Sequence, residues 1–357
     1  MPATELRWDI FAQAAASHAV VGAAWLGVQG TAPPSSELHR VYVASRARHL
    51  ALIDETHRVL QVLDEASVRS AAVKGVVLAE TVYPRPDLRV SQDVDVIVEA
   101  SSFASAVESL EAAGYSLLAR NWLLMRDLMP PAVTLLSPTG ILVDLQWSLV
   151  ADARMRCAGN ATPRLLDRAR VVSIGGSPLR TLDRADTFVH TCMHAAQSGA
   201  DRLMWLEDAR MVAMAANLDD ARERAMEWEV APSVAFALLR AARVFRSPQE
   251  SCESLQARRL AGSGVWRVVS DLASRLPQPY IWNPDAGHVL HSVARAARRN
   301  AASSDVELVR RGIARILHGP QTDRGRLWMA DEPISVMYET GGASERAAYF
   351  AAVETAV

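Results

Sequence analysis

One short stretch constrains the fold of this 357-residue chain more than any other. Residues 93–98 have the sequence Asp-Val-Asp-Val-Ile-Val, in which two carboxylates alternate with branched aliphatic side chains. Successive side chains of a strand point to opposite faces, so Asp93, Asp95 and Ile97 share one face and the three valines share the other. Such a strand folds where helices bury the valine face and the two carboxylates border a cleft. We therefore predict a sheet covered by helices, with an acidic site on one face.

A second stretch has the same alternation. In the strand predicted for Ile141–Trp147, Asp144 and Gln146 fall on one face, and the aliphatic and tryptophan side chains fall on the other. Mg²⁺ is usually bound by a few carboxylates together with phosphate oxygens and waters. Carboxylates held this close repel one another unless a cation lies between them. We predict that Asp93, Asp95 and Asp144 bind Mg²⁺ or Mn²⁺ in a two-metal site.

The only lysine of the chain, Lys74, precedes the first of these strands. Lysine and arginine together number 38, and subtracting this one lysine leaves 37 arginines. We expect such a chain to use arginine wherever a generic positive charge is enough. Lys74 is therefore interpreted as a position that needs a compact ammonium and not a planar guanidinium. The alternative is a surface lysine at the end of a strand.

Apolar spacing and turn residues predict three parts: a helical N-terminal arm (1–66), a catalytic module (67–150) and a small hairpin followed by a mainly helical C-terminal domain (151–357). The arm is predicted as helices over Glu5–Gln29 and from a cap at Ser35 or Ser36 to Glu65. The module is predicted as strands Val68–Val73 and Asp93–Val98, helices Gly75–Val82 and Ser102–Ala113, and an antiparallel pair Val133–Leu136 and Ile141–Trp147. The hairpin is predicted over Val171–Ile174 and Pro178–Leu182, and the helices after an Asp183 cap, at Arg202–Asn217, Val234–Phe245, Val265–Leu276 and Gly287–Leu317. The predicted fold class is α+β with a mixed sheet.

The charge balance and the spacing of the cysteines indicate which binding partners and which cellular compartment to expect. With 38 basic and 40 acidic residues the net charge is −2, so no global field attracts nucleic acid or anionic lipid, and we expect neither as a partner. Cys157, Cys192 and Cys252 form no CxxC pair and no zinc-ligand spacing, which favours a reducing, cytoplasmic location. The apolar stretch Ala14–Val28 is too short to span a bilayer and has no basic leader before it.

The order and spacing of these residues resemble those of the DNA polymerase β-like nucleotidyltransferase superfamily. Within it they are similar to an uncharacterised bacterial branch, over about Val68 to Met214, in the elements Lys74-Gly75, Arg89, Asp93-x-Asp95 and Val143-Asp144-Leu145-Gln146-Trp147. The resemblance implies a polymerase β-like mixed sheet and a nucleoside triphosphate as co-substrate. It implies metal binding and catalysis by Asp93, Asp95 and Asp144, with Lys74 as a further catalytic residue. The nucleotide-binding residues that it implies are Lys74, Gly75, Arg89, Ser91, Arg202, Trp205 and Asp208.

The segment after the module also resembles the branch, in its helical motif His190, His194, Arg202, Leu203, Trp205, Leu206 and Asp208. The branch tends to have a histidine where this chain has Gln146, so we expect no proton transfer at position 146. His190 and His194 lie four residues apart, a spacing that can bind zinc, but no third ligand accompanies them, and helix packing is the favoured interpretation. Arg202, Trp205 and Asp208 share a helical face that suits a core contact as well as a nucleotide contact.

The predicted activity is metal-dependent transfer of a nucleoside monophosphate, AMP from ATP, to an unidentified acceptor such as a peptide or small-molecule natural product. Lys74 and the Gly75 amide would steady the phosphate oxygens, and Asp144 would help to activate the acceptor. A glycosyltransferase is disfavoured, because its Asp-x-Asp usually ends a hydrophobic strand, whereas here the hydrophobic run follows the aspartates. A P-loop kinase is excluded, because no GxxxxGK[ST] string occurs. The remaining alternative is a degenerate nucleotidyltransferase fold that acts as a nucleotide-binding or scaffold module.

Overall fold

The computed structural model describes residues 7–33, 36–245, 257, 259–260, 262, 264–276, 284–318 and 341–356. Its strands are β1 (Ser70–Val73), β2 (Asp93–Val98), β3 (Ser116–Leu117), β4 (Ala132–Leu136), β5 (Leu142–Gln146), β6 (Arg170–Ile174) and β7 (Ser177–Thr181). The helices before β6 are α1 (Trp8–Ser17), α2 (Val21–Val28), α3 (Glu37–Glu65), α4 (Gly75–Thr81), α5 (Phe103–Ala112), α6 (Trp122–Leu128) and α7 (Thr162–Asp167). Those after β7 are α8 (Arg184–Gln197), α9 (Leu203–Ala215), α10 (Leu218–Glu227), α11 (Ala231–Phe245), α13 (Val265–Ala273), α14 (Pro284–Ala294), α15 (Ala301–His318) and α16 (Ala343–Glu354). No helix within these residues is long and apolar enough to cross a membrane.

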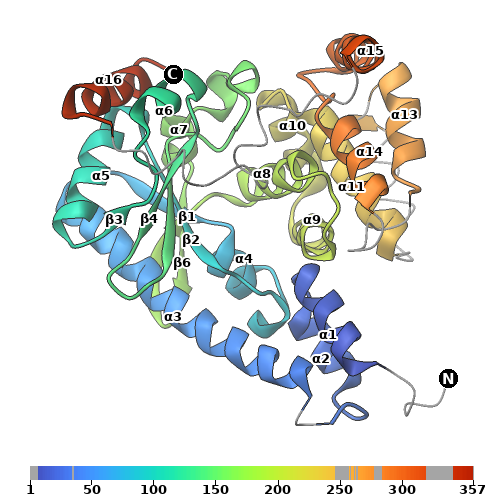
Figure 1. Cartoon of the computed structure of the whole chain (residues 1–357), viewed down its shortest axis with the longest axis horizontal. Coiled ribbons are helices and arrows are strands. Elements are labelled where there is room, and N and C mark those ends of the chain that lie inside the picture. The colour runs from blue at the N-terminus through green and yellow to red at the C-terminus, as the bar shows by residue number, and fades with distance from the viewer. Residues whose placement is uncertain are drawn as a thin grey trace.

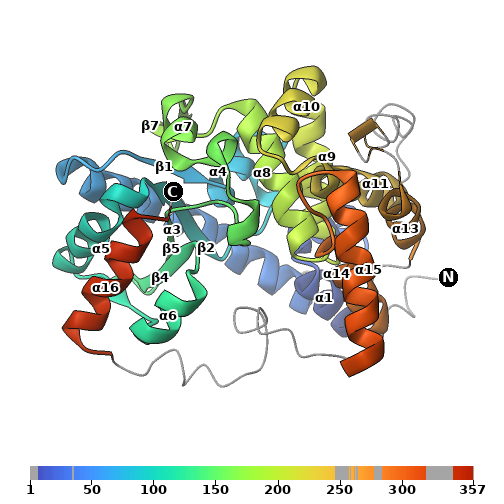
Figure 2. The same cartoon turned by 90° about the horizontal axis from the view of Figure 1, so that it is seen from above.

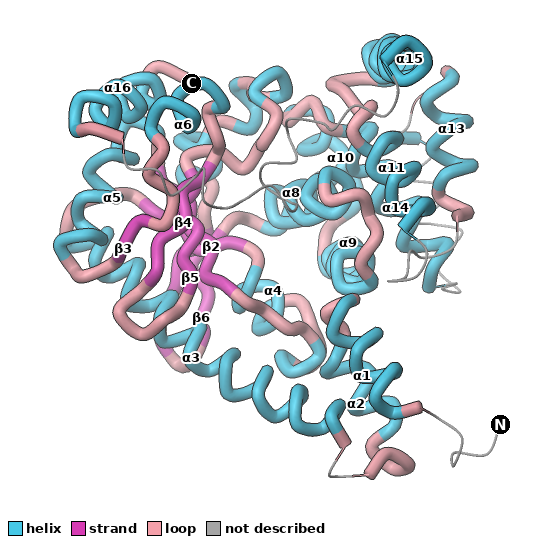
Figure 3. Tube along the Cα trace, viewed as in Figure 1, coloured by secondary structure: helices cyan, strands magenta, loops and turns pink. Residues whose placement is uncertain are grey.

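All seven strands form one mixed sheet in the order β3-β4-β5-β2-β1-β7-β6. β4 and β5 form the antiparallel pair that the sequence predicts, and β2 lies between β1, to which it is antiparallel, and β5, to which it is parallel. The β6–β7 hairpin extends this same sheet, because β7 pairs in parallel with β1. The predicted α+β class is confirmed, with the strands on one side of the molecule and most of the later helices on the other (Figure 3).

Different helices cover the two faces of the sheet. The first cluster of buried side chains joins Val94, Val96 and Val98 of β2 to α3, α5 and α16. The second cluster joins Ile97 of β2 and Ala71 and Val73 of β1 to α8, α9 and α11. Figure 1 and Figure 2 show α5 and α16 beside the strands and α8, α9 and α11 grouped on the opposite side. The alternating sequence of β2 thus contributes to both cores.

Two helices of the arm brace the loop that leads into β2. α1 and α2 pack against the first half of α3, which begins with the predicted Ser36 cap. α2 also packs against the short 3-10 helix η2 (Pro86–Leu88), where Gly22 permits a close approach: a Cβ there would lie 1.8 Å from the Asp87 carbonyl oxygen. Tyr42 of α3 donates a hydrogen bond of 2.6 Å to the Asp87 side chain. The arm therefore supports the backbone just before the site.

Two helices that the sequence predicts as continuous are each divided into two in the structure. The helix predicted over Glu5–Gln29 is two helices, because the chain turns between α1 and α2, where Ala19 adopts a φ of 53°. The helix predicted over Gly287–Leu317 is likewise divided into α14 and α15. Alanine and histidine occupy the first break and arginines occupy the second, so neither carries a glycine or proline signal. The sequence prediction also omitted β3, α6, α7, α10 and α16.

Candidate active site

The three carboxylates lie on neighbouring central strands. β2 and β5 are parallel, and their register places Asp95 directly opposite Asp144 and Asp93 opposite Leu142. Ile97, on the Asp93 and Asp95 face of β2, is buried in the cluster with α8, α9 and α11. The predicted alternation is therefore confirmed. The acidic face of the sheet is the one turned toward the helical half of the molecule (Figure 1).

Lys74 ends β1 and begins the turn into α4. Its backbone has a φ of 48° and a ψ of −131°, which is a strained conformation for a residue with a side chain. This turn places Lys74 Nζ 2.7 Å from Asp95 Oδ1, and Gln146 Nε2 donates a hydrogen bond of 2.7 Å to the same oxygen. Burial disfavours the ammonium, but the Asp95 carboxylate, with the charges of Asp93 and Asp144, raises the pKa of Lys74. Lys74 is thus a fixed positive charge against the acidic strand.

The charged forms of the other two carboxylates, Asp93 and Asp144, are disfavoured. Burial, together with the charges of Asp95 and Asp144, raises the pKa of Asp93 to about 7. Burial and the Asp95 charge also raise the pKa of Asp144, although Thr134 on β4 donates a hydrogen bond of 2.6 Å to it. Among the described residues, Asp93 has no side-chain hydrogen bond or ion pair. One lysine therefore does not neutralise the three carboxylates.

The donor set fits a hard divalent cation. Its protein ligands would be carboxylate oxygens, which Mg²⁺ and Mn²⁺ prefer, and a cation would offset the burial and the carboxylate repulsion that raise the pKa of Asp93. In the described part of the chain no three His, Cys, Asp or Glu side chains are already gathered as a metal-binding group. Binding of a cation would therefore draw Asp93, Asp95 and Asp144 closer together.

Arg89 forms a buried network behind the Lys74–Gly75 turn. Its guanidinium donates to Asp208 from Nε and Nη2 at 2.8 and 2.9 Å, and from Nη1 to the Gly75 carbonyl at 2.9 Å and to Ser91 Oγ at 2.7 Å. Tyr83 also donates to Asp208, at 2.6 Å. These contacts occupy the donors of Arg89 and link the turn to α9. Direct nucleotide contact by Arg89, Ser91 and Asp208 stays a prediction, and what the structure describes for them is support of the turn.

The other predicted nucleotide residues lie on α9 and its cap. Trp205 is buried, and the Arg202 guanidinium lies over its ring at 4.8 Å from the centroid. His194 of α8 contacts the same indole edge to face, with ring centroids 5.8 Å apart, and His190 lies next to His194 at 6.4 Å. Burial, followed by the charge of Lys74, lowers the pKa of both histidines well below 6.5, so both imidazoles are neutral.

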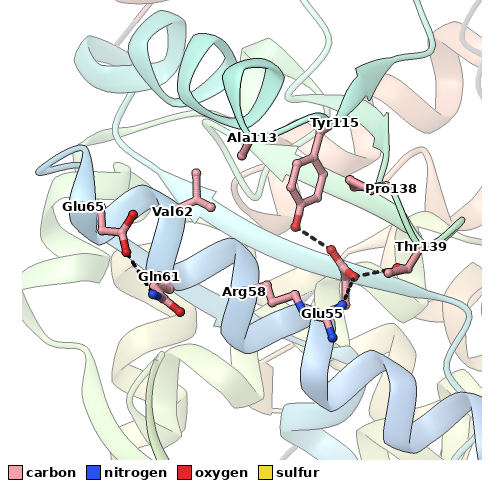
Figure 4. A pocket seen from close by; sticks show the side chains of 9 residues that line it. All are labelled: Glu55, Arg58, Gln61, Val62, Glu65, Ala113, Tyr115, Pro138 and Thr139. Carbon is pink, nitrogen blue, oxygen red and sulfur yellow. Dashed lines mark hydrogen bonds and ion pairs between the residues drawn. The ribbon is translucent and has the colours of Figure 1, made fainter.

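A hollow of about 290 Å³ lies elsewhere, between α3, the end of α5 and the β4–β5 turn (Figure 4). Glu55 lies at its base, where its carboxylate accepts hydrogen bonds from Tyr115 and, at 2.7 Å, from Thr139. Arg58 lies 3.4 Å from the same carboxylate. None of the predicted site residues lines this hollow, and its buried carboxylate is satisfied by the protein itself.

The structure has a central mixed sheet with aspartates on adjacent strands, and a short lysine-glycine turn precedes them. This is the arrangement that the resemblance to nucleotidyltransferases implies. A family model described as "Uncharacterised nucleotidyltransferase" matches residues 4–246. The chain therefore belongs to this nucleotidyltransferase family. No curated protein matches the chain. The crystal structure of an antigenic nucleotidyltransferase-like protein from Paracoccidioides brasiliensis is similar at a TM-score of 0.37 and 16% identity, over 57% of this chain and 92% of that one.

Two residues of the site had no role in the sequence prediction. Thr134 was predicted only as part of a strand, and Gln146 was discussed only because the family pattern suggests a histidine there. The structure shows that each holds one carboxylate, Thr134 on Asp144 and Gln146 on Asp95. The antiparallel register of β4 and β5, which pairs Thr134 with Asp144, is the signal that identifies the first contact. The second depends on the parallel register of β2 and β5, which pairs Ile97 with Gln146 and which the sequence does not specify.

Proposed function

We propose that this chain is a metal-dependent nucleotidyltransferase that transfers a nucleoside monophosphate, AMP from ATP, to a peptide or small-molecule acceptor. The observation that carries the proposal is the register of β2 and β5, which sets Asp95 beside Asp144 with Lys74 Nζ 2.7 Å from Asp95. The pKa of Asp93, which burial and the charges of Asp95 and Asp144 raise, supports it, since a cation would offset both the burial of the charge and the repulsion.

In the proposed reaction, an acceptor oxygen or nitrogen attacks the α-phosphorus of the triphosphate. The bond from that phosphorus to the bridging oxygen breaks, and pyrophosphate leaves with the electron pair. Asp93, Asp95 and Asp144 would hold Mg²⁺ or Mn²⁺, which supplies neutralisation of the phosphate charge and a lower pKa for the acceptor hydroxyl. Lys74 and the Gly75 turn position the phosphates, and Asp144 or solvent takes the acceptor proton.

Gln146 restrains one carboxylate without exchanging protons. Its amide donates to Asp95 Oδ1, and an amide has no titratable proton at neutral pH. This contact leaves the second oxygen of Asp95 for a cation or a phosphate-bound water. We therefore assign Gln146 to positioning of Asp95.

One observation favours the alternative of a nucleotide-binding or scaffold module. Lys74 already neutralises Asp95, so a cation must compete with an ion pair whose Asp95 side chain is only 5% exposed. In such a module, a triphosphate would bind at the Lys74 turn without being cleaved. Turnover and binding are therefore measured separately.

The test is a transfer assay with ATP, GTP, CTP and UTP, each labelled at the α-phosphate, in Mg²⁺ and against a panel of peptides and small molecules. We expect label to move to an acceptor with release of one pyrophosphate, and Asp93→Asn to abolish both. Binding of triphosphate without transfer to any acceptor would support the scaffold alternative. If the protein neither binds triphosphate nor transfers the label, the proposed function is rejected.

A further inference from the structure

His190 is a buried histidine of α8 whose ring, within the described residues, contacts His194 and makes no hydrogen bond. It is 3% exposed, and no hydrogen bond or ion pair to its ring occurs within the residues that the structure describes. His194, one turn later on α8, is partly exposed and likewise has only ring contacts there. An imidazole that has no hydrogen-bond partner within the described chain can still bond to a ligand.

Arg202 is a second polar side chain without an ion-pair partner among the described residues. Through Trp205 it lies next to His194, and we call His190, His194 and Arg202 the α8–α9 wall. Arg202 is exposed at the start of α9, and within the described chain its guanidinium has no carboxylate partner, in contrast to the buried Arg89 nearby. Its guanidinium carbon lies 4.8 Å from the centroid of the Trp205 ring in a cation–π contact. Planar donors of this kind match the oxygens of a phosphate in a bidentate pair.

The position of this wall relative to the carboxylates indicates which part of a substrate it meets. The charges that act on His190 and His194 come from cations: Lys74 acts on both, and Arg89 and Arg202 act on His194. Asp93 and Asp144 instead act on one another across β2 and β5. Packing gives the same location, because α8 and α9 are buried with Ile97 on the Asp93 and Asp95 face of the sheet, and Asp208 of α9 pairs with Arg89 behind the Lys74 turn. The histidines of α8 therefore lie over the acidic face, on the side of Lys74.

We propose that His190, His194 and Arg202 bind the terminal phosphates of the triphosphate and hence the pyrophosphate that leaves. This inference rests on the proposed function, and it assigns the phosphate end of the substrate to α8 and α9. Neutral imidazoles donate N–H hydrogen bonds to phosphate without adding charge to a site that already contains Lys74 and Arg202. Within the described residues, no third His, Cys, Asp or Glu lies with this pair of histidines to complete a zinc site.

Inorganic tripolyphosphate is the probe, because it lacks a nucleoside and cannot be transferred. Its affinity for the full-length protein is measured by calorimetry in Mg²⁺ for the wild type, His190→Phe and Arg202→Ala. Arg222→Ala is the matched control, an exposed arginine on α10 without an ion pair in the described structure. We expect His190→Phe and Arg202→Ala each to weaken binding by about tenfold or more, as loss of a hydrogen bond to a charged group does, and Arg222→Ala to leave it unchanged.

A second measurement observes the binding of tripolyphosphate to the wild-type protein directly. In protein labelled with ¹⁵N at histidine, the His190 ring resonances, identified by their absence in His190→Phe, should shift on titration with tripolyphosphate. Unchanged affinity in Arg202→Ala together with unshifted His190 resonances would overturn the inference, even if nucleotide transfer is observed. Absence of tripolyphosphate binding to the wild type would also overturn it. If the wild type neither binds nor transfers nucleotide, the proposed function is rejected instead.

Discussion

Replacing either of the two aspartates of β2 by asparagine removes one negative charge, yet we expect opposite effects on stability. Asp93 has only repulsive carboxylate neighbours and distant cations, whereas Asp95 pairs with Lys74 and accepts from Gln146. Asp93→Asn should therefore stabilise the metal-free protein, and Asp95→Asn should destabilise it. The two changes are chemically identical and lie two residues apart, so each is the control for the other.

The magnitude for Asp93 follows from its pKa. Raising this pKa from 3.8 to about 7 makes the charged form cost about 4 kcal/mol in the folded protein. The folded state then binds a proton more tightly than the unfolded state, so wild-type stability falls as pH rises from about 4 to about 7 and is level above that. At pH 8 we expect Asp93→Asn to raise the free energy of unfolding by about 2–4 kcal/mol. Near pH 4 the gain should vanish.

For Asp95, the expected effect comes from the partner that is left behind. Lys74 has a side chain only 16% exposed, and Asp95→Asn would leave its ammonium without a buried counter-charge. Breaking a buried pair by removing one partner costs about 3–5 kcal/mol, and the asparagine oxygen can still accept one hydrogen bond. We therefore expect a loss of about 3 kcal/mol at pH 8.

The assay is urea unfolding in EDTA at pH 5 and pH 8, with comparison of both midpoints and slopes. Asp127→Asn on α6, whose side chain is 71% exposed, is the surface control and should change stability by less than about 0.5 kcal/mol. A destabilised Asp93→Asn protein at pH 8 would refute the reasoning, and so would equal effects of the two asparagine variants. Either result would mean that Asp93 has a structural counter-charge.

Three further outcomes are expected. Lys74→Arg should turn over no faster than Lys74→Ala, because the guanidinium is bulkier than the ammonium now held 2.7 Å from Asp95; a near wild-type rate would reduce Lys74 to a generic positive charge. Asp208→Asn should lower the free energy of unfolding by about 3 kcal/mol, as urea unfolding would show, because Arg89 loses its buried partner; an unchanged midpoint would contradict the structural role of that pair. Gly22→Ala should destabilise or release the arm, because the new Cβ would lie 1.8 Å from a carbonyl oxygen of η2, whereas Gly27→Ala, with open space around it, should not; limited proteolysis of the two variants compares them directly.

The faces of the acidic strand could be predicted because they depend on a local rule. Alternation in residues 93–98 places the valines in one core and Ile97 in the other, as the structure shows. The β4–β5 hairpin was equally accessible, since two apolar runs flank the Ser-Pro-Thr-Gly turn at residues 137–140. Both predictions use only neighbouring residues.

Contacts between distant segments were not predictable in the same way. Arg89 and Asp208 are 119 residues apart in sequence, and nothing near either residue specifies the other. The parallel pairing of β7 with β1 likewise brings Ala72 opposite Thr181, and no local pattern near either residue specifies the other. The break at Ala19 shows the same limit on a smaller scale, because packing of α1 and α2 against α3 overrides continuous helical periodicity.

Calorimetry of triphosphate binding tests the central claim most directly. ATP is titrated into the wild type and into Asp93→Asn, each in Mg²⁺ and in EDTA, because one buried and two half-buried carboxylates should repel the phosphates unless a cation neutralises them. We predict tight binding by the wild type in Mg²⁺ alone, and loss of that metal dependence in Asp93→Asn. Equal affinity of the wild type in Mg²⁺ and in EDTA would contradict a metal-dependent nucleotide site at Asp93, Asp95 and Asp144.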